Sequence, residues 1–269
     1  MKRYAKDFHD KSQYVKQNLW PEGKMPYKQD HQCVPYLEWY VPEKLTSKSI
    51  QIIYSGGSYQ GNAPDGFEVA PFRRYLNEKG MTVVTMRYRT PRPKGLAKHT
   101  SAWADLQRCI RIVRAEAPKR GLDPNKIGIM GSSAGGHLAS TAATHFTEET
   151  RPDFQILFYP VVTMTDYTHQ GSKDNLLGKN PSEELVKLYS NELQVNENTP
   201  PAFIMHSSDD TVVPVLNSIN YYLAMCKHGV PASMHFYPVG GHGWGYNETF
   251  PYKSQWKAEM EKWLREIHK

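Results

Sequence analysis

Near the middle of its 269 residues the chain reads Ile127-Gly128-Ile129-Met130-Gly131-Ser132-Ser133-Ala134-Gly135-Gly136-His137-Leu138-Ala139. A short β-type run meets the pattern Gly-x-Ser-x-Gly, with Ser133 at its centre, and a helix-compatible stretch follows. On such a turn the serine takes a strained backbone conformation, and Gly131 and Gly135 leave room for the neighbouring chain. The turn exposes the hydroxyl and directs the Ala134 amide toward a developing oxyanion. The pattern predicts a nucleophile at Ser133. The alternatives are Ser132, in the wrong position of the motif, and a small-residue loop that only packs closely.

On both sides of this turn, short apolar runs alternate with helix-like segments. The strand candidates are residues 36–41, 50–54, 81–87, 126–130, 154–159, 202–206 and 232–237. Helical patterns occupy residues 72–79, 101–117, 136–145, 182–190, 215–228 and 252–267. Such alternation is typical of an α/β fold with a mostly parallel sheet and helices on both faces. We predict one domain over residues 36–269, an irregular N-terminal arm over residues 1–35, and a small insertion around residues 163–199.

The composition excludes several classes of protein. Hydrophobic residues make up 39% and charged residues 22%, which indicates a globular chain rather than a disordered or collagen-like one. No apolar run approaches the ~20 residues of a membrane span. The three cysteines form no Cys-x-x-Cys pair, which argues against a disulfide scaffold and a thiolate zinc site. No metal or organic cofactor is expected.

The net charge of +6 raises the question of a nucleic-acid partner. The basic residues are dispersed, and the densest group stands among prolines in a predicted loop, at Arg87, Arg89, Arg92 and Lys94. We therefore expect no nucleic-acid binding. The first residues contain no apolar h-region, so we expect no signal peptide in this chain. A removed leader would look the same, which leaves cytoplasmic, periplasmic and secreted locations open.

A serine hydroxyl needs a base, and the base needs a carboxylate to orient it. On a fold with this turn the three residues follow the order Ser, acid, His. Asp209 and Asp210 come after the predicted strand 202–206, and His242 stands among glycines after the predicted strand 232–237. Both segments follow the carboxyl ends of strands, where sites form in parallel sheets. We predict His242 as the base. Either aspartate can serve as the acid, while the other holds the turn by local hydrogen bonds.

The chain resembles the α/β-hydrolase superfamily and, within it, the bacterial feruloyl-esterase-like and acetylxylan-esterase-like carbohydrate esterases. The resemblance extends from about residue 34 to residue 267. It depends on Gly56-Gly57, Arg87-Tyr88-Arg89-Thr90-Pro91, Gly131 to Gly136, Tyr159-Pro160, Asp210-Thr211-Val212-Val213-Pro214 and Gly241-His242-Gly243. In the family's Asp-x-x-Val-Pro element the acid leads, and this implies Asp210 rather than Asp209.

The resemblance also implies a second oxyanion donor. Related esterases carry His-Gly-Gly-Gly after the second recognisable strand, where this chain has Ser55-Gly56-Gly57-Ser58. The amide of Gly57 or Ser58 would join that of Ala134, with the choice between the two left open.

The implied function is a serine esterase that removes acetyl or feruloyl groups from plant carbohydrate esters, with a small-molecule or oligosaccharide ester as its partner. Tyr59 and Trp244, near the predicted catalytic loops, are expected to stack on a sugar or aryl group, with packing in the interior as the alternative. Arg87 and Arg89 are expected to fix their loop through hydrogen bonds and ion pairs, with a place along the substrate path as the alternative. Asp105 is expected to be structural. Three alternatives are a prolyl-oligopeptidase-like peptidase, a general short-chain carboxylesterase and a non-catalytic binding protein on the same fold. The sequence indicates no oligomeric state.

Overall fold

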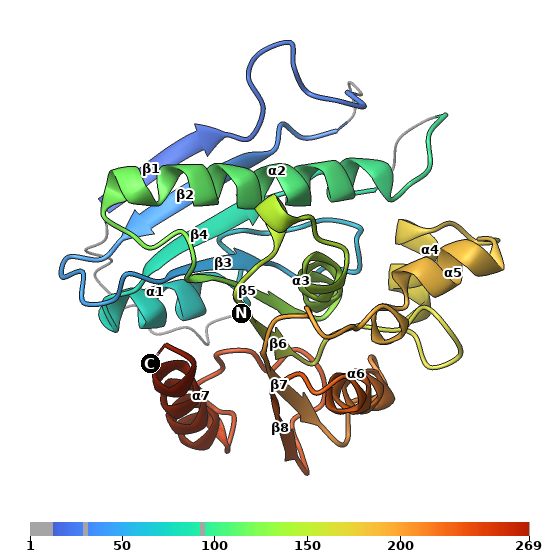
Figure 1. Cartoon of the computed structure of the whole chain (residues 1–269). Helices are drawn as coiled ribbons and strands as arrows, with labels where there is room; N and C mark the ends of the chain where they lie inside the picture. The colour runs from blue at the N-terminus through green and yellow to red at the C-terminus, as the bar shows by residue number, and fades with distance from the viewer. Residues whose placement is uncertain (1–12, 29–31, 92–94, 269) are drawn as a thin grey trace.

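A computed structural model describes residues 13–28, 32–91 and 95–268. Its centre is an eight-stranded sheet in the order β1-β2-β4-β3-β5-β6-β7-β8 (Figure 1). The strands are β1 (Gln13–Asn18), β2 (Tyr36–Val41), β3 (Ile50–Tyr54), β4 (Thr82–Arg87), β5 (Ile127–Ser132), β6 (Phe154–Phe158), β7 (Ala202–Ser207) and β8 (Ala232–Tyr237). β1 and β2 pair antiparallel with their neighbours, and all pairings from β4 to β8 are parallel.

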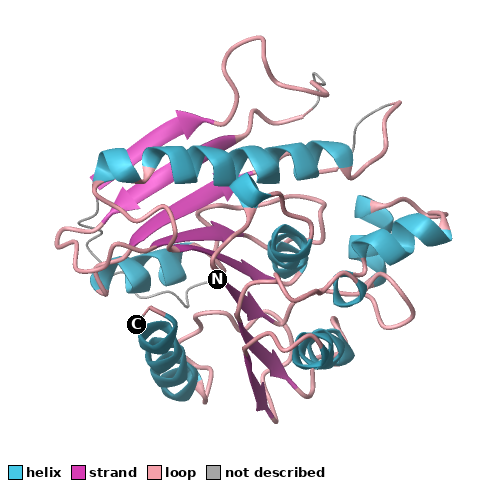
Figure 2. Cartoon of the chain, in the orientation of Figure 1, coloured by secondary structure: helices cyan, strands magenta, loops and turns pink. Residues whose placement is uncertain are grey.

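Helices cover the sheet on both faces, as Figure 2 shows. They are α1 (Ala70–Glu78), α2 (Thr100–Glu116), α3 (Ala134–Thr144), α4 (Gln170–Leu176), α5 (Glu183–Tyr189), α6 (Leu216–Lys227) and α7 (Lys253–Ile267). Side chains of α2, α3 and α6 belong to one buried cluster and those of α1 and α7 to a second. The predicted α/β class, with a mostly parallel sheet between helical layers, is confirmed.

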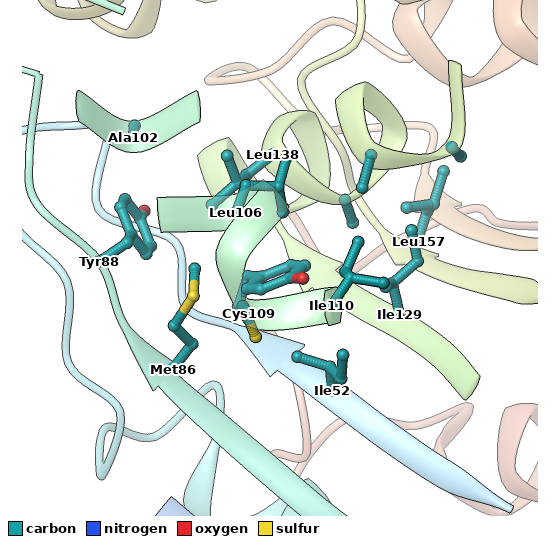
Figure 3. Packing of buried hydrophobic residues seen from close by; sticks show 14 of the residues in the cluster. Ile52, Met86, Tyr88, Ala102, Leu106, Cys109, Ile110, Ile129, Leu138 and Leu157 are labelled. Atoms are coloured by element: carbon teal, nitrogen blue, oxygen red, sulfur yellow. The ribbon is translucent and has the colours of Figure 1, made fainter. Parts of the chain in front are cut away.

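The helix α2 illustrates why these segments fold as they do. Its apolar residues recur at three- and four-residue spacing, so Leu106, Ile110 and Val113 form one stripe, and all three are fully buried. Figure 3 shows this helix over the sheet, with Leu106 and Ile110 near Ile52 of β3 and Met86 of β4. Burial of each side chain of this size contributes about 1.5–3 kcal/mol. This packing fixes the strands whose ends form the candidate site.

Two elements differ from the sequence prediction. Residues 13–18 form the strand β1, paired with β2, although the arm before residue 36 was expected to be irregular. In the insertion around residues 163–199, a helix was expected over residues 182–190 only. The structure has a second helix there, α4, which precedes α5, and both lie together at one side of the molecule (Figure 1). Arg92 and Lys94 of the basic group lie outside the described residues. None of the helices in the described ranges combines the length and apolar character that a membrane crossing requires.

Candidate active site

The turn at Ser133 joins β5 directly to α3. Ser133 has φ 54° and ψ −122°, a left-handed conformation that costs energy in a residue with a side chain. A Cβ on Gly131 would collide with the carbonyl oxygen of Gly135, and a Cβ on Gly135 with that of Tyr54. The two glycines therefore permit the helix to start against the strand, and the strained turn presents the Ser133 side chain beyond the sheet edge.

His242 and Asp210 lie within hydrogen-bond distance of this serine in a chain of three groups. The Ser133 hydroxyl donates to His242 Nε2 over 2.9 Å, and His242 Nδ1 donates to Asp210 Oδ2 over 2.7 Å. The serine follows β5, the aspartate β7 and the histidine β8, so the parallel strands deliver all three to one sheet edge. The structure brings these three sequence-predicted residues together, in the arrangement that a base-activated nucleophile requires.

The Asp210 carboxylate is buried and surrounded by donors. Its Oδ1 accepts the amides of Val212 and Val213, each over 2.9 Å. His206, at the end of β7, approaches Oδ2 at 3.2 Å through its Nε2. Burial by itself would raise the pKa of Asp210, but hydrogen bonds from His206, His242 and the Val213 amide lower it well below its usual range. The carboxylate therefore remains charged beside the imidazole.

Asp209 binds a different part of the site. Its exposed carboxylate accepts the amides of Gly240 and Gly241, over 3.2 and 2.8 Å. These glycines immediately precede His242, so Asp209 fastens the loop that carries the imidazole. Of the two adjacent aspartates, Asp210 is the one that contacts His242.

The loop between β3 and α1 lies against the nucleophile. A Cβ added to Gly56 would be 3.2 Å from the Ser133 Cβ. Gly57, Ser58 and Tyr59 have successive positive φ angles of 118°, 53° and 57°, a backbone that can direct neighbouring amides toward one anion. In α4, Asn175 Nδ2 donates to the Ser58 carbonyl oxygen over 2.9 Å. Gly56, which precedes the predicted donors at Gly57 and Ser58, thus lies against Ser133. The Ala134 amide, the other predicted donor, belongs to the unpaired first turn of α3.

The expectation that Tyr59 and Trp244 stack on a substrate is contradicted by their burial. Tyr59 is 1% exposed, and its hydroxyl is 2.7 Å from His137 Nδ1. Trp244 is 4% exposed and stacks on Phe250 at 4.1 Å between ring centroids. Both rings fill the interior behind the loops, which leaves no ring face for a sugar.

Sequence reasoning missed three residues around the site. His206, on the predicted strand 202–206, was not singled out, yet it contacts Asp210. Tyr159 was quoted only as part of a motif, yet its ring packs on His242 at 4.8 Å between centroids. Glu68 was not singled out, and its Oε1 accepts the Tyr159 hydroxyl over 2.9 Å. The motif Tyr159-Pro160 was the available signal for Tyr159, and no local pattern marks the glutamate.

The insertion contributes His169, which lies near His242. Its side chain accepts the Ser172 amide at the start of α4. Burial lowers the pKa of His169, His242 lowers it further, and Asp210 opposes both. These couplings place α4 close to the site. Among the described residues, no three His, Cys, Asp or Glu side chains are grouped so that they could hold a metal ion.

Comparisons with known proteins identify a family and several relatives of this chain. The family model BD-FAE matches residues 37–225. The chain is 37% identical over 234 residues to an acetylxylan esterase of Xylanibacter ruminicola, covering 85% of this chain and 47% of that protein. It is 32% identical over 263 residues to endo-1,4-beta-xylanase B of Butyrivibrio fibrisolvens, covering 93% and 41%. The solved acetyl ester-xyloside bifunctional hydrolase from Caldicellulosiruptor lactoaceticus superposes with a TM-score of 0.86 at 35% identity, covering 94% and 96%.

The sheet and its helices define an α/β hydrolase, as the sequence predicted. The chain belongs to the BD-FAE family, so the predicted resemblance to this group of carbohydrate esterases is confirmed. It spans less than half the length of the two curated relatives, 47% and 41%.

Proposed function

We propose that this chain is a serine carboxylic-ester hydrolase that removes acyl groups from plant carbohydrate esters. The observation that carries the proposal is the continuous hydrogen-bonded series Ser133–His242–Asp210, with heavy-atom separations of 2.9 and 2.7 Å. The names of the relatives, acetylxylan esterase and acetyl ester-xyloside hydrolase, favour an ester over a peptide bond and a carbohydrate as the alcohol.

In the acylation half-reaction, Ser133 Oγ attacks the ester carbonyl carbon while its proton passes to His242 Nε2. The carbonyl oxygen becomes an oxyanion, held by the amide of Ala134 and by that of Gly57 or Ser58. Asp210 fixes the ring through Nδ1 and stabilises the imidazolium. When the tetrahedral intermediate collapses, the bond to the alcohol oxygen breaks, and His242 returns its proton to that oxygen.

Deacylation repeats these steps with water. His242 takes a proton from the attacking water, whose oxygen bonds to the acyl carbon, and a second oxyanion forms in the same hole. Collapse breaks the bond to Ser133 Oγ, which recovers its proton from His242, and the free acid leaves.

Acetyl and feruloyl groups are the two acyl candidates. The relatives named for acetyl esters make acetyl the first candidate, with xylan-derived oligosaccharides as the alcohol. A panel of acetylated xylo-oligosaccharides, feruloylated arabinose esters and nitrophenyl esters of increasing chain length tests this order. We expect acetylated xylo-oligosaccharides to give the highest kcat/KM. A preference for long-chain nitrophenyl esters would replace the carbohydrate assignment with a general carboxylesterase.

The matched variants Ser133→Ala and Ser132→Ala test the nucleophile. We expect S133A to lose about 10⁶-fold in kcat and to resist covalent labelling by a fluorophosphonate, because Ser133 carries the one hydroxyl that hydrogen-bonds His242 among the described residues. S132A should still be labelled. Unchanged unfolding curves would exclude loss of fold as the cause. Turnover by S133A, or a wild-type chain that neither hydrolyses esters nor reacts with the probe, would contradict the proposal.

A further inference from the structure

A second carboxyl group, Glu68, stands beside the catalytic groups without belonging to the triad. It lies in the loop just before α1, where its Oε1 accepts the Tyr159 hydroxyl over 2.9 Å. Its Oε2 is so close to Gly56 that a Cβ on this glycine would collide with it. Gly56 is in turn the residue that lies against Ser133. The loop between β3 and α1, which contains Gly56 and the predicted oxyanion donors, is called the oxyanion loop below. The Glu68 carboxyl therefore bridges this loop and Tyr159, the residue that follows β6.

Tyr159 carries this connection to the general base. It is fully buried, and its ring packs on the His242 ring at 4.8 Å between centroids and 63° between planes. Its backbone has φ 35°, and its amide donates to the Met205 carbonyl oxygen over 2.7 Å. Strain of this kind persists only where the surroundings enforce it. Ser58, Tyr59 and Ser133 also have positive φ, so four strained non-glycine residues surround the site.

Charge couples Glu68 to His242 as well. Burial raises the pKa of Glu68, while the hydrogen bond from Tyr159, the nearby His242 and the Gly56 amide oppose the rise. A negative charge on Glu68 therefore attracts a positive charge on the nearby His242 ring. Other groups also face this pair. Asp210 and His169 interact with His242. Burial raises the pKa of Tyr88, and the Glu68 charge raises it further.

We propose that Glu68 is a positioning residue of the hydrolase reaction. It ties the oxyanion loop at Gly56 to Tyr159 and hence to the ring face of His242, and its charge stabilises the imidazolium that forms in each transition state. The inference depends on the proposed esterase function and adds a second carboxylate to the support that Asp210 gives the base. The hydrogen bond needs an acceptor at residue 68, whereas the electrostatic effect needs a negative charge there.

The variants Glu68→Gln and Glu68→Ala separate these two requirements. Gln keeps an acceptor for Tyr159 without the charge, and Ala removes both. With nitrophenyl acetate we expect kcat to fall about 10-fold in E68Q and about 100-fold in E68A. Because E68Q lacks the negative charge beside the His242 ring, the acid limb of its kcat/KM profile should move to lower pH. Asp65→Asn, an exposed carboxyl in the same loop, is the matched control and should keep the wild-type profile.

Unfolding curves of each variant report whether the fold is intact. If the wild type is active and E68Q keeps the wild-type kcat and acid limb, the inference is overturned and the esterase function stands. Equal losses in E68Q and E68A with an unmoved acid limb would likewise overturn it, because that result describes a merely structural residue. A wild type that hydrolyses no ester would overturn the proposed function itself, and this inference with it.

Discussion

Asp209 and Asp210 are adjacent in the chain, yet their carboxylates bind different parts of the site. Asp210 is buried and contacts His242 Nδ1, with two backbone amides on its other oxygen. Asp209 is exposed and accepts two amides of the loop that carries His242. Asp210 therefore acts on the charge and tautomer of the imidazole, whereas Asp209 acts on the position of the backbone that carries it.

The pair Asp210→Asn and Asp209→Asn should differ strongly in activity. D210N is expected to lose on the order of 10⁴-fold in kcat, because a neutral amide neither stabilises the imidazolium nor keeps Nδ1 protonated. D209N retains one oxygen acceptor for the loop and should lose about 10-fold or less. Initial rates with nitrophenyl acetate measure both. Equal losses in the two variants would contradict the assignment of Asp210 as the acid.

At the scale of elements, a buried ion pair joins the end of β4 to α2 and to the N-terminal arm. Arg89 and Asp105 are fully buried and meet at 2.7 Å. The Asp105 carboxylate also accepts the Trp20 indole N–H over 2.8 Å, and Arg89 donates to the Pro26 carbonyl oxygen over 2.6 Å. The expectations that Arg89 fixes its loop and that Asp105 is structural are confirmed.

Removal of one partner should be costly. Asp105→Ala is expected to lower the free energy of unfolding by about 3–5 kcal/mol, because it leaves the Arg89 charge buried without its carboxylate. The double variant Arg89→Met/Asp105→Leu should recover part of this loss. Glu149→Ala, which breaks an exposed pair with Arg111, is the control and should cost about 0–1 kcal/mol. Urea unfolding measures all three. A D105A loss no larger than that of the control would show that the buried pair contributes little.

The elements that the sequence predicted correctly are those with a strong apolar pattern. The strands β3, β5, β6 and β7 are buried along their whole length, so most of their residues are apolar. β1 was missed because it is an edge strand with largely exposed residues, and its partner β2 supplies the reason for it to be extended. α4 was missed because it has seven mostly polar residues and is capped by the side chain of His169.

The residues of the site likewise divide into those that a local sequence pattern marks and those that it does not. Ser133, Asp210 and His242 were predictable because each occupies the carboxyl end of a recognisable strand, and parallel strands bring those ends together. Glu68 and Tyr159 stand 91 positions apart, and only the packed structure brings them into contact. Burial misled the sequence reading at Tyr59 and Trp244, because an aromatic residue beside a catalytic loop can face the core or the substrate with the same local pattern.

At the scale of the whole molecule, buried histidines couple stability to pH. Burial lowers the pKa of His99, His145, His169, His235 and His268, and it lowers that of His137 to about 4. His137 is fully buried between the Tyr59 hydroxyl at Nδ1 and the Tyr189 carbonyl oxygen at Nε2, partners that suit a neutral ring. An unfolded histidine titrates near pH 6.5. Between pH 6.5 and 4 the unfolded chain thus binds a proton at His137 that the folded chain does not, so acidification destabilises the fold in this window.

The size of this effect can be isolated with His137→Gln. The shift from 6.5 to about 4 corresponds to about 3 kcal/mol of stability lost by the wild type between those pH values. H137Q should be less stable at pH 7 by about 1–3 kcal/mol, because glutamine replaces only part of the hydrogen bonding. Its further decline to pH 4 should be smaller than that of the wild type by about 3 kcal/mol. The exposed His228→Gln is the control and should decline in parallel with the wild type.

Urea unfolding at pH 7, 6, 5 and 4 gives the three curves. The raised pKa values of Glu68, Asp153 and Glu192 act in the opposite direction, but they are common to all three proteins and leave the differences unaffected. Equal declines in H137Q and the wild type would show that His137 takes up its proton without unfolding.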